Sequence, residues 1–143
     1  MAYATPADMV ARFGEVEIIR LSAPDGDLAG EGNRAKVALA LADATVQIDS
    51  YIARRYVTPL SPVPPVVVAH CCALARYALA QGEGRAPTEQ MRDAHKDSLA
   101  WLASVAKGDA ALPDVDPISA SSSFAKAQDR PPMFVPRDRD GLY

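Results

Sequence analysis

The most constraining feature of the sequence is a sixteen-residue segment, VVVAHCCALARYALAQ at positions 66–81, that is apolar at nearly every position. Its clearly polar members are His70, Arg76 and Gln81. Pro65 precedes it and suits the first turn of a helix, where the missing N–H of proline costs nothing. A helix that is apolar nearly all round must be covered by other elements. The segment therefore predicts a helical bundle with this helix at its centre.

The preceding part of the chain supplies a long partner helix. From Asn33 to about Arg55, apolar residues recur at spacings of four and three, as on one face of a helix. They are Val37, Leu41, Ala44, Ile48 and Tyr51. The solvated stripe of the helix consists of Lys36, Asp43, Gln47, Ser50 and Arg54, so we expect the apolar face to be buried in the core.

Shorter helices are predicted on either side from their end signals. Thr5, Pro6 and Asp8 form a helix start, which Gly14 ends, and residues 15–21 can form a further short turn of helix. Thr88 followed by Glu89 begins the last helix, and Lys107 with Gly108 ends it. Met91, Leu99, Leu102 and Val105 give that helix an apolar face.

Three segments should not be helical. Residues 22–32, rich in Gly, Asp and Pro, are expected to form an exposed loop. TPLSPVPP at 58–65 has four prolines in eight residues, which favours a stiff, extended spacer. Beyond Gly108, a Pro-, Ser- and Ala-rich stretch lacks an apolar period.

These features predict an all-α fold: a small helical bundle of about four helices with a Pro-rich spacer and an extended C-terminal arm. The 143 residues are enough for one domain with a single apolar core. The expected division is a helical domain at 1–108, a linker at 109–132 and a docking arm at 133–143.

Two sets of residues are candidates for contacts with another protein. Leu39 and Val46 lie seven apart and fall roughly opposite the apolar face of their helix, so packing that face leaves them outside the core. The arm MFVPRDRDGLY ends the chain with apolar side chains around alternating charges. Its candidate residues are Phe134, Val135, Arg137, Asp138, Arg139, Leu142 and Tyr143.

Patterns for catalysis or for metal binding are weak. His70, Cys71, Cys72 and His95 lack the spacing of a zinc site, and the cysteines suit buried thiols in a reducing, intracellular setting. Asp25, Asp27 and Gly30 resemble part of a calcium loop, but Ala29 and Lys36 occupy two ligand positions. No phosphate loop or nucleophile motif occurs. We expect a protein that is not an enzyme and has no metal or cofactor.

Charges and hydropathy exclude further classes. With 15 Lys and Arg against 18 Asp and Glu, the net charge is -3, and the basic residues are scattered, unlike those of a nucleic-acid-binding surface. No apolar run reaches the roughly 20 residues of a membrane span, and the start has no secretion signal.

Arg76 is the one charge in an apolar helix. Asp49 on the facing helix is a candidate partner, and the alternative is an arginine whose head reaches water.

Four stretches of the sequence carry a resemblance to a known family. They are YATPADMVARFG, ALADATVQIDSYIARRYVTPLSPVPP, CCALARYAL and FVPRDRDGLY, in this order over nearly the whole chain. Through them the chain resembles the Mu-like phage head-to-tail connector, or adaptor, family. The Ser/Ala-rich linker and the Cys71–Cys72 pair depart from the family's pattern.

The resemblance implies a structural virion protein, assembled in the bacterial host cytoplasm and placed at the head-to-tail joint. Its implied partners are the portal protein, neighbouring copies in a ring, twelve by the symmetry of the portal, and a stopper or tail-completion protein. DNA passes through the ring without sequence-specific binding, and no membrane is involved. The alternatives are another tail-completion or assembly factor, or a small-molecule-binding helical regulator.

Overall fold

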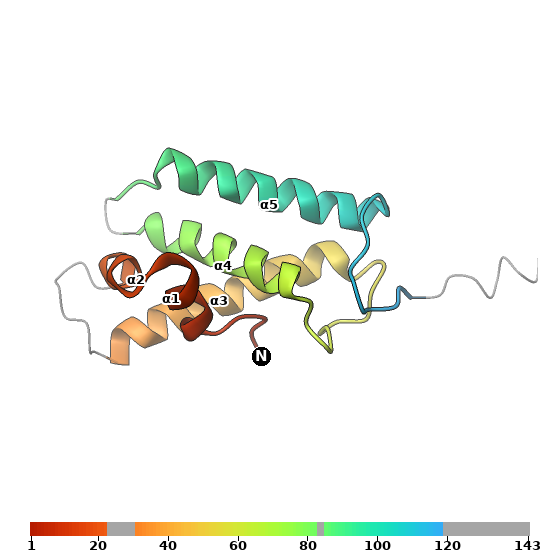
Figure 1. Cartoon of the computed structure of the whole chain (residues 1–143), viewed down its shortest axis with the longest axis horizontal. Coiled ribbons are helices and arrows are strands. Elements are labelled where there is room, and N and C mark those ends of the chain that lie inside the picture. The colour runs from red at the N-terminus through yellow and green to blue at the C-terminus, as the bar shows by residue number, and fades with distance from the viewer. Residues whose placement is uncertain (23–30, 83–84, 119–143) are drawn as a thin grey trace, which may run out of the picture.

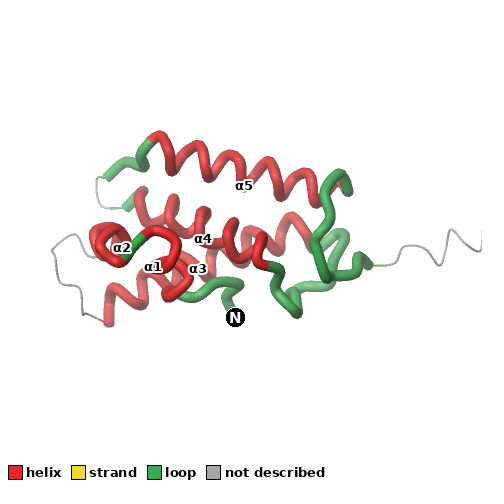
Figure 2. Tube along the Cα trace, viewed as in Figure 1, coloured by secondary structure: helices red, strands yellow, loops and turns green. Residues whose placement is uncertain are grey.

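The computed structural model describes residues 1–22, 31–82 and 85–118, with residues 31 and 32 described by their backbone alone. The described part contains five helices and no strand, which confirms the all-α prediction (Figures 1 and 2). The helices are α1 (Pro6–Phe13), α2 (Glu15–Ser22), α3 (Glu31–Ile52), α4 (Pro65–Ala80) and α5 (Glu89–Lys107). None of them is long and apolar enough to cross a membrane.

The number of helices is five rather than about four because α1 and α2 are separate elements. Thr5 accepts a hydrogen bond from the N–H of Asp8, and the Asp8 carboxylate accepts one from the N–H of Thr5, so the predicted start of α1 is a capping box. Gly14 then takes a φ of +90°, which a glycine adopts without strain, and α2 begins at Glu15.

Helix α4 lies at the centre, as its apolar sequence predicts. It contacts each of the other four helices, and so does α3 (Figure 1). Cys71 and Cys72 are free, fully buried thiols, as expected, and burial raises the pKa of both, that of Cys72 to about 11. Because the thiol form is favoured, both side chains act here as small apolar groups.

The predicted inner face of α3 is confirmed, while the ends of the helix differ slightly. Val37, Leu41, Ala44 and Ile48 are buried, Tyr51 is half-buried against the core, and Ile52 joins the core. The helix runs from Glu31 to Ile52 instead of from Asn33 to about Arg55. The predicted exposed loop is also shorter than 22–32, because Ser22 is the buried last residue of α2, where its hydroxyl donates to the carbonyl of Ile18 at 2.8 Å. Residues 23–30 lie outside the described residues.

The proline segment is not helical, as predicted, but it bends at residues 58–59 and 61–62 instead of extending as a spacer, and its apolar members pack on the helices. Leu60 is buried, and its N–H donates to the hydroxyl of Tyr3 at 3.0 Å. The same hydroxyl donates to the carboxylate of Asp49 on α3, and the N–H of Tyr3 donates to the hydroxyl of Thr45 at 2.9 Å. The first residues of the chain therefore tie the proline segment to α3.

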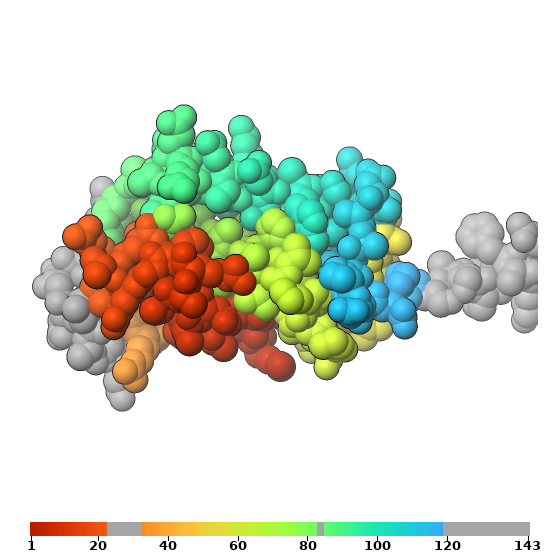
Figure 3. All heavy atoms as spheres, viewed as in Figure 1, coloured from red at the N-terminus to blue at the C-terminus, as the bar shows by residue number. Residues whose placement is uncertain are grey.

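The core continues beyond residue 108, where the sequence predicts a linker. Leu112 is buried in the main cluster, and its N–H donates to the hydroxyl of Tyr56 at 3.0 Å. Figure 3 shows this segment, in blue, against the end of the bundle. Gly108 ends α5 in the left-handed conformation, as predicted, and Arg55 donates to the carbonyl of Val105 at 3.3 Å. The rest of the predicted linker, 119–132, lies outside the described residues.

Candidate interaction surface

An apolar row follows the outer face of α3. It consists of Ala35, Leu39, Ala42 and Val46, all exposed, and is called the α3 row below. Leu39 and Val46 keep 62% and 68% of their surface accessible, so they lie outside the core, as the periodicity predicts. Their contact with another subunit stays a prediction.

An open hollow of about 290 Å³ borders the α3 row on one flank. Leu39 lies on its wall, together with Lys36 and Asp43 of the same helix. The remaining lining residues come from α2, from α3 and from the C-terminal end of α4 and the residues after it: Leu21, Ala40, Ala78, Leu79, Gly82 and Arg85. The surface around Leu39 is thus concave and combines apolar walls with charges of both signs.

Arg85 fixes the wall of this hollow by holding the end of α2. Its guanidinium donates to the carbonyl of Leu21 at 2.9 Å and to the carbonyl of Arg20. A cation at the C-terminus of a helix satisfies carbonyls that have no partner within the helix and interacts favourably with its dipole. The sequence does not indicate this contact, because Arg85 is 64 residues away from Leu21 and no local pattern surrounds it.

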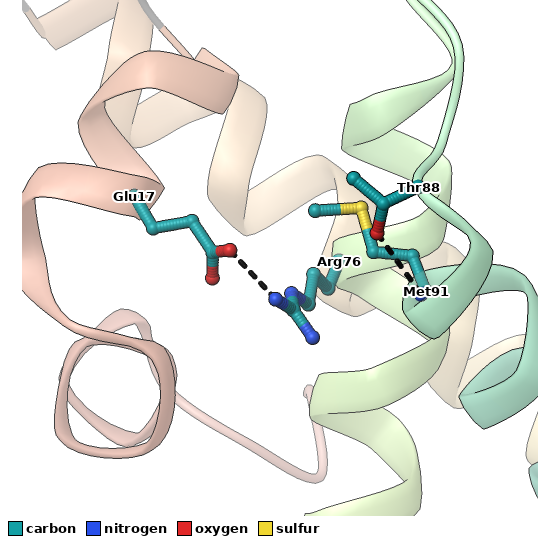
Figure 4. Close-up of polar contacts among 4 residues, drawn as sticks. All are labelled: Glu17, Arg76, Thr88 and Met91. Atoms are coloured by element: carbon teal, nitrogen blue, oxygen red, sulfur yellow. Dashed lines mark hydrogen bonds and ion pairs between the residues drawn. The ribbon is translucent and has the colours of Figure 1, made fainter.

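The predicted Arg76–Asp49 pair is wrong. Arg76 donates to Glu17 of α2 at 2.6 Å (Figure 4). Its guanidinium lies 4.4 Å from the ring centre of Phe13. Asp49 instead accepts the hydroxyl proton of Tyr3. The Arg76 side chain is 13% exposed, so most of its surface is covered at the contact with α2. The pair links α2 to the central helix.

Figure 4 also shows the predicted cap of α5, in which Thr88 accepts from the N–H of Met91 at 3.2 Å.

Both histidines lie between α4 and α5, where each stacks on an aromatic ring. His70 stacks on Trp101 with ring centres 4.3 Å apart, and His95 stacks on Tyr77 at 3.9 Å. Nδ1 of His70 lies 2.9 Å from the hydroxyl of Ser98, whereas Nδ1 of His95 is buried without a hydrogen-bond partner. Burial lowers the pKa of both imidazoles.

No metal-binding group is present within the described ranges. No cluster of three or more His, Cys, Asp or Glu side chains has the geometry to hold an ion there. The residues that resemble a calcium loop, Asp25, Asp27, Ala29 and Gly30, lie outside these ranges. The candidate arm residues Phe134, Val135, Arg137, Asp138, Arg139, Leu142 and Tyr143 also lie outside them.

The structure also shows exposed apolar side chains that the sequence analysis did not single out. Val10, Val16, Val57 and Ile118 keep between 38% and 70% of their surface accessible. Val10 lies on α1 and Val16 on α2, in short helices where too few turns exist to define two faces. Val57 and Ile118 lie in irregular segments, where periodicity gives no information.

Comparison with known proteins assigns the chain to a phage family. The sequence profile of the family described as "Bacteriophage Mu, Gp36" matches residues 3–128. The chain belongs to this family. "Gene product J" of Escherichia phage Mu is 34% identical to it over 138 residues, which is 94% of each chain. The "Mu-like prophage FluMu protein gp36" of Haemophilus influenzae is 46% identical over 76 residues, 53% of this chain and 52% of that protein. This Gp36 family member is therefore a Mu-like phage protein.

Proposed function

We propose that this member of the Mu Gp36 family is a structural head-to-tail connector without enzymatic activity. Copies form a ring under the portal, at the head-to-tail joint of the virion, and the ring mounts the stopper or tail. The observation that carries the proposal is the α3 row, an exposed apolar surface on a helix that contacts all four other helices.

The size of the α3 row suits a contact that is repeated around a ring. Burying one Leu or Val side chain contributes about 1.5 to 3 kcal/mol, so Leu39 and Val46 together contribute about 3 to 6 kcal/mol before ordering costs. One such contact is weak by itself. In a closed ring each subunit makes it with both neighbours, and a portal of matching symmetry adds further contacts that act together.

The partners follow from this arrangement. They are neighbouring copies, twelve if the ring follows the portal, together with the portal protein and a stopper or tail-completion protein. The arm at 133–143 carries apolar residues toward one of these partners. The scattered charges and the net charge of -3 suit a channel that DNA crosses, because a strongly basic lining would retain phosphates.

Cryo-electron microscopy of the neck in purified virions tests the proposal. The expected result is a ring with the α1–α5 bundle in the portal's stoichiometry, between portal and tail. A protein that takes part in assembly but is absent from purified particles would instead be an assembly factor, and the connector proposal would be rejected.

A further inference from the structure

The α3 row has the spacing of a helix–helix seam. Its residues follow one another at intervals of four, three and four, which is the spacing of the a and d positions in a two-stranded coiled coil. The row spans about three helical turns, or roughly 17 Å. Small and large side chains alternate along it, in the order Ala35, Leu39, Ala42, Val46.

This alternation is self-complementary when two helices run in opposite directions. If the two α3 helices pack with the symmetry axis between residues 40 and 41, Leu39 of one copy lies against Ala42 of the second. Val46 of one copy likewise lies against Ala35 of the second. Every large side chain then meets a small one, as close packing requires. A parallel pair would place leucine on leucine and alanine on alanine, which leaves gaps at the alanine layers.

The charges beside the α3 row favour the same orientation. Lys36 and Asp43 are exposed and lie seven residues apart on one flank. In an antiparallel pair equal flanks meet, so Lys36 faces Asp43 of the second copy, and symmetry repeats the contact. In a parallel pair this flank would meet the opposite one, where Ala38 is exposed and Thr45 is buried, so neither offers a charge.

We propose that two free copies of the protein pair through antiparallel α3 helices. The contact is isologous, since the same surface is used on both copies. Each copy contributes one short row, so the total area buried is below the roughly 1,200 Å² of a stable interface. The dimer should therefore be weak, with a Kd on the order of 100 μM. The inference does not depend on the ring. A ring contact made through the same residues requires the pair to open first.

Disulfide trapping tests the orientation. Ala35→Cys and Val46→Cys variants are mixed at high concentration under mild oxidation, without portal. An antiparallel pair gives mainly the disulfide between position 35 of one variant and position 46 of the other. If each variant cross-links with itself as often as with the other variant, the antiparallel pair is rejected. Both positions are exposed, so folding should be unaffected, and the unsubstituted protein is the control because Cys71 and Cys72 are fully buried.

Sedimentation of charge variants tests the pairing itself. Lys36→Asp and Asp43→Lys should each weaken the dimer by about tenfold, because each places like charges together twice, and the double exchange should restore the Kd to within about threefold. Circular dichroism checks that the helices are kept. A protein that stays monomeric up to about 1 mM and loses portal binding with Leu39→Asp would assign the α3 row to the portal and overturn the pair.

Discussion

Two tyrosine hydroxyls hold the irregular parts of the chain. Tyr3 accepts the N–H of Leu60 and Tyr56 accepts the N–H of Leu112, both at 3.0 Å. A buried N–H without an acceptor is costly, and irregular segments have no helix or sheet to supply one. Burial and the hydrogen bond to Asp49 raise the pKa of Tyr3, so its hydroxyl stays protonated and can donate to that carboxylate.

Tyr3→Phe should therefore lower the free energy of unfolding by about 1 to 3 kcal/mol, because it leaves the Leu60 N–H without its acceptor. Denaturant unfolding measures the change. Tyr51→Phe is the matched control, since Tyr51 is half-buried and makes no hydroxyl hydrogen bond within the part of the chain that the structure describes. Equal effects of the two variants would contradict the role given to Tyr3.

A double-mutant cycle should show that Arg76 is coupled to Glu17. Arg76→Leu and Glu17→Leu are each expected to destabilise the protein, with a coupling energy of about 1 to 2 kcal/mol, because truncating one side leaves a partly buried charge unpaired. A parallel cycle with Asp49→Asn should give a coupling energy near zero. A larger coupling to Asp49 than to Glu17 would favour the pair predicted from the sequence.

The sequence could predict that Arg76 needs a partner, but it could not predict which one. The apolar surroundings are local and visible in the sequence, whereas Glu17 is 59 residues away on a helix of only eight residues. The same limit applies to Tyr3 and Arg85. Their contacts depend on how helices are placed in three dimensions, which periodicity does not encode.

At the scale of elements, two ring stacks join α5 to α4. Helix α5 contacts only α3 and α4 among the five helices, and His70 and His95 lie in the α4 contact. Glu89, Arg92, Asp93 and Lys96 line the hollow beside His95, so both signs of charge surround that ring. The unpartnered Nδ1 of His95 has no acceptor for an added proton.

Thermal stability should fall as the pH falls below about 6.5. Burial lowers the pKa of both histidines, so the unfolded chain binds more protons than the folded one in this range. The contribution of the two histidines to the free energy of unfolding is fully present above their pKa in the unfolded chain, about 6.5. It is lost as the pH falls toward their lower pKa in the folded protein. Melting temperatures between pH 5 and 8 measure the slope.

The His70→Phe/His95→Phe double variant should show a smaller fall of the melting temperature between pH 6.5 and 5. Phenylalanine keeps an aromatic ring at each stack but cannot bind a proton. Because carboxylates titrate mainly at lower pH, the difference between the two curves isolates the imidazoles. Parallel curves between pH 5.5 and 7 would show that the histidines do not contribute.

Helix ends could be predicted well because their signals are local. Thr5 and Thr88 cap as expected, and Gly108 ends α5 in the left-handed conformation. The packing of 109–118 was not predictable, because Ala110, Ala111, Leu112 and Val115 follow no helical or strand period. The burial of Leu112 depends on a surface built by Tyr56, which follows the end of α3.

For the whole molecule, the α3 row separates folding from assembly. Leu39→Asp or Val46→Asp should leave helicity and melting temperature nearly unchanged and should impair ring formation, because a carboxylate would have to lose water at the contact. Circular dichroism and electron microscopy with portal measure the two outcomes. Leu41→Asp, two residues away and fully buried, is the control and should unfold the protein. Global unfolding by Leu39→Asp would place that residue in the core.

Removal of residues 133–143 should weaken attachment to portal or to neighbouring copies and leave the helical domain folded. The removed residues include the apolar side chains of Phe134, Val135, Leu142 and Tyr143, whereas Leu112 and the rest of the described core stay in place. Co-sedimentation with portal compares the full and the shortened chain. Equal binding would reject the docking role of the arm.

The outer face of α3 belongs to a helix that contacts every other helix of the bundle. A molecule that grips this face therefore holds an element against which α1, α2, α4 and α5 all pack. Capture of α3 would slow amide hydrogen exchange in the neighbouring helices wherever their opening also opens α3, because that opening would then require release of the captured face. Assembly at one narrow row would stiffen the subunit as a whole.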